Sequence, residues 1–127
     1  MIVLVSSFLL LGCGEQSIPE RLMGAWKIYD VDFIGEGISN EVKAGTRHVA
    51  HSVKYSFESD FTYTISSGLD EAGNGTWKYR EETGEIILTP QLEEPFAAKV
   101  FFSDENALAL HFEKSKTVVI YHLKRIN

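Results

Sequence analysis

The sequence lacks several features that would assign it to a common functional class. Only one cysteine occurs in the 127 residues, so no internal disulfide can form. Lys and Arg total 12 against 18 for Asp and Glu, and the net charge of −6 comes without the basic stripe of nucleic-acid-binding proteins. We also find no Gly-x-Ser-x-Gly motif, glycine-rich phosphate loop or His-Glu-x-x-His motif. We therefore expect neither nucleic-acid binding nor enzymatic activity.

What is present suits a single globular domain. Hydrophobic residues make up 44% of the chain and charged residues 24%, so there is enough apolar content to offset the entropy of ordering. The length lies within the range of about 100–200 residues that is typical of one domain.

The N-terminal segment has the pattern of an export signal. The first 14 residues carry no charge and contain an apolar run from Ile2 to Leu11. This run is shorter than the roughly 20 residues that span a bilayer, but it fits the apolar region of a signal peptide. It ends in Leu10-Leu11-Gly12-Cys13, which resembles the lipobox of bacterial lipoproteins.

The lipobox resemblance implies that Cys13 receives a diacylglycerol and becomes the N-terminus after cleavage behind Gly12. We then expect a signal peptide at 1–12, a lipidated cysteine and tether at 13–17 and the folded domain at 18–127. Gly14 in place of Asp favours the outer membrane over the inner membrane of the bacterial envelope. The segment has no Lys or Arg at its start. A start upstream of Met1 and a buried N-terminal strand with a core cysteine stay open as alternatives.

The mature chain has the pattern of an all-β protein. Ser17-Ile18-Pro19-Glu20 predicts a single helical turn, and we expect no further helix. Period-two alternation predicts eight short antiparallel strands, and an up-and-down barrel closes such a set without free edges. A two-sheet sandwich is the alternative. The strands are expected near residues 26–33 (with a bulge), 49–57, 61–65, 75–79, 86–88, 100–102, 108–112 and 119–123, with a polar loop at 35–45.

Gly24-Ala25-Trp26, placed directly after the predicted helical turn, resembles the Gly-x-Trp opening of the lipocalins. The resemblance implies that the helix plugs the floor of an eight-stranded barrel, that Trp26 packs above it, and that Arg125 or Lys124 covers the ring. Three further segments resemble the lipocalin-like domains of small bacterial lipoproteins: Tyr55-Ser56-Phe57 with Tyr63, Gly75-Thr76-Trp77, and Tyr121-His122-Leu123-Lys124. Asp60-Phe61 departs from the Asp-Gly that such domains tend to have, so the geometry of that turn is open.

One segment comes close to a calcium-binding loop. Asp70 to Glu81 matches that motif except at its third position, where Ala72 offers no ligand. Because strand patterns flank the segment, we favour a glycine-rich hairpin.

The histidines and paired acids do not predict a metal or catalytic site. His48 and His51 differ in strand parity and so should point to opposite faces. If Phe112 pairs with Thr117, His111 and His122 lie opposite Val118 and Ala107. Asp30 and Asp32 share one strand face, and we expect both to be exposed. We predict no metal and no cofactor.

The aromatic residues are the remaining functional candidates. An eight-stranded barrel is just wide enough either to be filled by side chains or to hold one small ligand. A solid core and a ligand cavity are therefore both possible interpretations of the aromatic residues. If a pocket exists, its tyrosines supply the hydroxyl contacts and the 35–45 loop is the natural lid. The candidate ligand-binding residues are Tyr55, Phe57, Tyr63, Trp77, Tyr79, Phe102, Phe112 and Tyr121, with Trp26 at the barrel floor.

The sequence thus predicts a membrane-anchored lipoprotein that binds a small apolar or amphipathic ligand. The alternative is a solid barrel whose rim loops engage another envelope protein, as an inhibitor or an assembly factor.

The lipobox hypothesis predicts that Cys13→Ser abolishes lipidation and moves the protein out of the membrane fraction. Cell fractionation with immunodetection measures this. Unchanged membrane retention of the variant would contradict the hypothesis.

Overall fold

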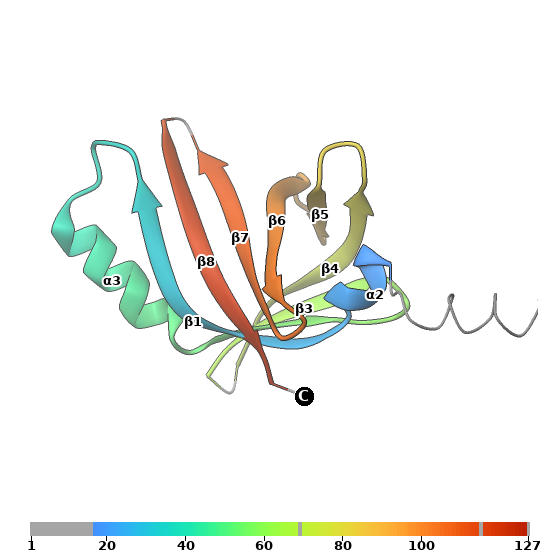
Figure 1. Cartoon of the computed structure of the whole chain (residues 1–127). Coiled ribbons are helices and arrows are strands. Elements are labelled where there is room, and N and C mark those ends of the chain that lie inside the picture. The colour runs from blue at the N-terminus through green and yellow to red at the C-terminus, as the bar shows by residue number, and fades with distance from the viewer. Residues whose placement is uncertain (1–16, 69, 115, 127) are drawn as a thin grey trace, which may run out of the picture.

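A computed structural model shows a closed antiparallel barrel, in which each strand pairs with the next and the last with the first (Figure 1). It describes residues 17–68, 70–114 and 116–126, so the predicted signal peptide and Cys13 lie outside the described part. The up-and-down barrel is confirmed and the sandwich was wrong. The strands are β1 (Gly24–Ile34), β2 (Val53–Phe57), β3 (Thr62–Ser67), β4 (Asp70–Arg80), β5 (Glu85–Pro90), β6 (Phe96–Asp104), β7 (Ala107–Lys114) and β8 (Thr117–Arg125).

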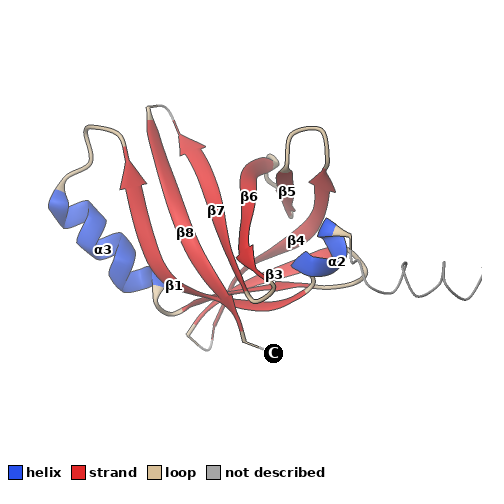
Figure 2. Ribbon diagram, in the orientation of Figure 1, coloured by secondary structure: helices blue, strands red, loops and turns tan. Residues whose placement is uncertain are grey.

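Two helices accompany the barrel in the described residues, α2 (Ile18–Leu22) and α3 (Asn40–Ala50). They lie at different places, α2 beside the start of β1 and α3 alongside the rest of that strand (Figure 2). No helix in the described ranges has the length and hydropathy that a membrane crossing requires.

The barrel is closed at one end by α2 and by the Trp26 side chain. Ser17 caps α2 by accepting a hydrogen bond from the Glu20 backbone N–H. Trp26 is fully buried and donates its indole N–H to the carbonyl of Leu22, the last helical residue, at 2.9 Å. The guanidinium of Arg125 lies 4.2 Å from the centre of the Trp26 ring. This is the arrangement that the lipocalin resemblance implied.

Above this floor the inward-facing side chains form a packed core. The bulge expected in β1 is present, because its register against β8 shifts between Ile28 and Asp30. The shift leaves Tyr29 and Asp30 exposed and returns Val31 to the interior. The other large core residues include Leu22, Phe57, Trp77, Ile86, Leu88, Leu108, Leu110 and Leu123.

Residues 35–45 do not form the polar loop that we expected, because α3 begins at Asn40 and continues to Ala50. Ser39 caps this helix by accepting a hydrogen bond from the Val42 backbone N–H at 3.2 Å. The expectation of a single helix was therefore wrong. The predicted second strand was also too long at its start, since β2 begins at Val53.

Residues 70–80 form one continuous strand, β4, and not the glycine-rich hairpin that we favoured. The turn instead precedes the strand at Gly68, whose φ of +66° suits glycine. Within β4, a Cβ at Gly75 would overlap the carbonyl oxygen of Thr89. Glycine is therefore needed at this position for β4 and β5 to approach each other.

β7 and β8 pair two residues away from the register that we expected. Lys114, and not Phe112, lies opposite Thr117, because the turn is shorter. The shift changes the partners of both histidines: His111 lies opposite Ile120 and His122 opposite Ala109, in place of Val118 and Ala107.

The turn at Asp60 and Phe61 forms without glycine although Phe61 has a φ of +65°. One carboxylate oxygen of Asp60 accepts hydrogen bonds from the hydroxyl and the backbone N–H of Thr62, at 2.6 and 3.1 Å. These two bonds hold the pKa of Asp60 below its usual value. The Phe61 ring packs on Trp77 with 5.0 Å between centroids. Local hydrogen bonds and ring packing thus offset the strain of the left-handed backbone.

Replacing Trp26 with Ala should lower the free energy of unfolding by about 3–5 kcal/mol, because a fully buried ring leaves a cavity. Urea denaturation measures the change. Tyr29→Ala, on the same strand but 42% exposed, is the matched control and should cost less than about 1 kcal/mol. Equal effects of the two substitutions would contradict the described floor.

Candidate functional site: an apolar pocket between α3 and the barrel

The site begins at an interruption in the barrel wall. β1 pairs with β2 only from Gly24 to Lys27, while its pairing with β8 continues to Ile34. On the β2 side, the rest of β1 therefore has no strand partner among the described residues. α3 lies along this stretch (Figure 1). Its Arg47 donates from Nε to the Val31 carbonyl at 3.1 Å, which satisfies one backbone group of the edge.

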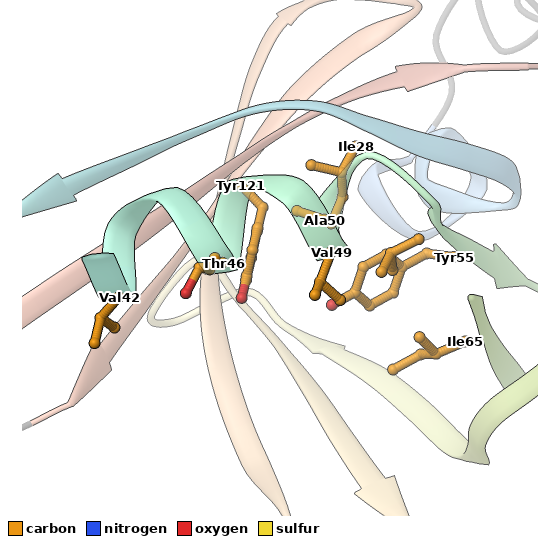
Figure 3. Close-up of a pocket in the computed structure, with 10 residues that line it drawn as sticks. Ile28, Val42, Thr46, Val49, Ala50, Tyr55, Ile65 and Tyr121 are labelled. Carbon is orange, nitrogen blue, oxygen red and sulfur yellow. The ribbon is translucent and has the colours of Figure 1, made fainter. Parts of the chain in front are cut away.

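A pocket of about 650 Å³ lies between α3 and the inner surface of the barrel (Figure 3). Most of its lining is aliphatic, and none of its lining residues is an acid, a lysine, an arginine or a histidine. Its volume is within the range of small-molecule sites in proteins. The lining residues are Ile28, Val42, Gly45, Thr46, Val49, Ala50, Val53, Tyr55, Ile65 and Tyr121.

The helical side of the pocket presents apolar surface that the protein itself does not cover. Val42 and Val49 are 58% and 57% exposed although both line the pocket. They lie two helical turns apart on one face of α3, with Thr46 between them. Exposed apolar side chains on a concave surface are typical of surfaces that bind a ligand or another protein.

Two tyrosine hydroxyls are the main polar groups on the barrel side. Figure 3 shows the oxygen ends of Tyr121 and Tyr55 directed toward Thr46 and Val49 of α3. In the described part of the chain, no hydrogen bond joins either hydroxyl to another group. Every fully enclosed side-chain N or O atom in the described residues has a hydrogen-bond partner. Because the two tyrosine hydroxyls have no such partner, they are not enclosed and reach the open space of the pocket.

Burial raises the pKa of Tyr55 above its usual value, and the neighbouring Tyr121 and Tyr63 raise it further. Burial also raises the pKa of Tyr121. Both groups are therefore neutral hydroxyls over the physiological range and can donate as well as accept a hydrogen bond.

The eight predicted ligand-binding residues separate into different environments. Tyr55 and Tyr121 line the pocket. Phe57 and Trp77 pack edge to face in the core, 5.6 Å apart, and the Trp77 indole donates to the Glu58 carbonyl at 3.2 Å. The remaining four lie elsewhere. Tyr63 is buried in the core, and Phe112 packs against Tyr121 and Phe96. Phe102 lies under the Arg21 guanidinium, and Tyr79 lies in a hollow beside Pro19.

The sequence predicts a polar loop at residues 35–45, so it does not identify the lining residues of α3. A signal was present, since Val42, Thr46, Val49 and Ala50 follow the spacing of one helix face. Gly45 within the segment and the apparent alternation from Val49 onward concealed it.

The histidines and paired acids, from which we predicted no metal or catalytic site, do not line this pocket. His122 Nε2 and an Asp32 carboxylate oxygen are 2.8 Å apart on the outer surface. His111 packs against Phe101 at 4.5 Å between ring centroids, and burial, then His122 and Lys99, lower its pKa. Among the described residues no group of three or more His, Cys, Asp or Glu side chains is arranged to hold a metal ion.

Comparison with solved structures finds a similar barrel. The chain shares its barrel fold with a DUF4847 family protein from Bacteroides vulgatus. That crystal structure aligns with a TM-score of 0.55 at 16% identity, over 87% of this chain and 100% of the other. At this identity the likeness shows the fold alone. No protein-family model matches the sequence, and no curated protein matches it.

The raised pKa of Tyr55 predicts how stability changes in alkali. The unfolded chain releases this proton near the ordinary pKa of about 10 while the folded chain retains it, so stability falls as the pH rises above about 10. Tyr55→Phe removes this contribution, and urea denaturation at neutral and alkaline pH should show a smaller alkaline loss than in the native sequence. An unchanged loss would mean that the Tyr55 hydroxyl is not buried as described.

Proposed function

We propose that this protein is a lipid-anchored, lipocalin-like barrel of the bacterial cell envelope that binds a small apolar or amphipathic molecule, and that it is a binding protein and not an enzyme. The observation that carries the proposal is the uncharged pocket of about 650 Å³ beside α3, with half-exposed valines on its helical side. An apolar ligand would remove this surface from water, which is the main source of affinity in such sites.

The position of the helices suits an anchored binding protein. The predicted tether leads into α2, which lies where β1 begins, whereas α3 follows the end of β1. With Cys13 lipidated, the closed end of the barrel would face the membrane and the far end would be directed away from it.

The alternative function, a module that engages another envelope protein, has one observation in its favour. The outer surface carries exposed aromatic residues, with Phe101 51% and Tyr29 42% exposed. This surface is separate from the pocket, so the two functions can be tested independently.

The ligand-binding proposal predicts that the purified protein enhances the fluorescence of N-phenyl-1-naphthylamine, a neutral apolar probe, with saturation at one equivalent. Val49→Arg should abolish the enhancement, because it places a charged side chain at the pocket mouth. Ile34→Arg is the matched control, since Ile34 is 57% exposed, like Val49, but does not line the pocket.

Equal binding by both arginine variants would place the probe elsewhere on the protein. Absence of saturable binding by the native sequence would contradict ligand binding and direct the search to protein partners of the outer surface.

A further inference from the structure

We infer that the pocket selects neutral amphiphiles, molecules with an apolar body and one uncharged hydroxyl or carbonyl group, through the hydroxyls of Tyr55, Tyr121 and Thr46. The inference rests on the proposed ligand-binding function and specifies the chemical class of the ligand.

The first argument is the unsatisfied hydrogen-bonding capacity of the pocket. Tyr55 is only 7% exposed, yet its hydroxyl makes no hydrogen bond within the described residues. This hydroxyl reaches the open space of the pocket, so a ligand that fills the pocket would enclose it, and leaving it unpaired would then be costly. The hydroxyls of Tyr121 and Thr46 line the same space and likewise make no hydrogen bond within the described residues. A ligand that brings one hydroxyl or carbonyl group would satisfy these groups.

The second argument is the absence of charge. None of the lining residues carries a charge at neutral pH. Arg47 does not line the pocket: its Nε donates to the Val31 carbonyl and its guanidinium lies 5.5 Å from the Phe33 ring centre, and neither Val31 nor Phe33 is a lining residue. An ionised carboxylate or ammonium group would lose its hydration without gaining an opposite charge. The pocket should therefore disfavour fatty acids and alkylamines relative to alcohols.

The third argument is the shape of the apolar lining. Val42 and Val49 lie on the helical side, and Ile28 and Ile65 lie on the barrel side of the same pocket (Figure 3). The two tyrosine hydroxyls are directed from the barrel side toward Thr46 and Val49 on the helical side. This arrangement fits a molecule whose polar group is inside the site and whose apolar body contacts both surfaces.

The test compares four ligands of equal chain length: octane, 1-octanol, octanoate and protonated octylamine. Each displaces N-phenyl-1-naphthylamine from the purified full chain held in amphipol, and displacement gives its Kd. We expect 1-octanol to bind more tightly than octane, and about tenfold more tightly than either ion.

Three substitutions test the hydroxyls individually: Tyr55→Phe, Tyr121→Phe and Thr46→Val. Loss of one neutral hydrogen bond should raise the Kd of 1-octanol by about three- to tenfold in the variants that contact its polar group. The Kd of octane should stay unchanged, which shows that the pocket remains folded. Tyr29→Phe is the matched control, because it removes an exposed hydroxyl outside the pocket.

The outcomes separate the two proposals. If the probe does not bind, or binds Val49→Arg normally, the proposed function fails. If the probe binds but every hydroxyl variant retains the native preference for 1-octanol over octane, ligand binding stands and the hydroxyl inference is overturned. Tighter binding of octanoate or octylamine than of 1-octanol would also overturn it, by showing that a charged group is recognised.

Discussion

Pairing between β1 and β2 ends at Lys27 and Lys54, whereas β1 itself continues to Ile34. A strand edge without a partner exposes backbone donors and acceptors that must be satisfied, and in this protein α3 lies along that edge. The hydrogen bond from Arg47 to the Val31 carbonyl connects the helix to the strand directly. Because a helix is bulkier than a strand and cannot continue the sheet, it leaves a space against the barrel interior. The pocket exists because a helix, and not a strand, lies beside this part of β1.

The opposite end of the barrel is organised around Arg125. Its guanidinium donates to the carbonyls of Met23 and Arg21 at 2.7 and 2.6 Å and also covers the Trp26 ring. Charge-assisted hydrogen bonds to backbone carbonyls are among the stronger ones in proteins. They connect the last strand to the segment around α2 and so close the floor. A solid core and a pocket therefore coexist in this barrel, one at each end. The two interpretations of the aromatic residues, as core and as pocket lining, do not exclude each other.

The side chains that line the pocket restrict the class of ligand, whereas the barrel fold alone does not. Eight-stranded barrels host carriers, inhibitors and enzymes, so the barrel alone identifies no function. The pocket adds an uncharged lining and hydroxyl groups without hydrogen-bond partners in the described residues. The ionisable contacts, such as the one between Asp32 and His122, lie on the outer surface instead. This separation of apolar interior and charged exterior favours binding of a neutral molecule.

Alternation in the sequence determined eight strands with one buried face each and indicated the bulge in β1, and the lipocalin resemblance implied the Trp26 floor. Closure into a barrel and not a sandwich was decided by the tertiary structure, since both architectures show the same alternation. The sequence did not identify α3, because Gly45 and the glycines before the helix favour a loop. A short helix also depends on tertiary packing for most of its stability, which the sequence pattern does not show. Nor did it separate core aromatics from pocket residues, since Phe57 and Tyr55 share one strand face and differ only in what lies above them. That difference arises where β2 ceases to pair with β1, a register that depends on contacts between strands distant in sequence. Only the tertiary structure therefore decided which tyrosines reach the pocket.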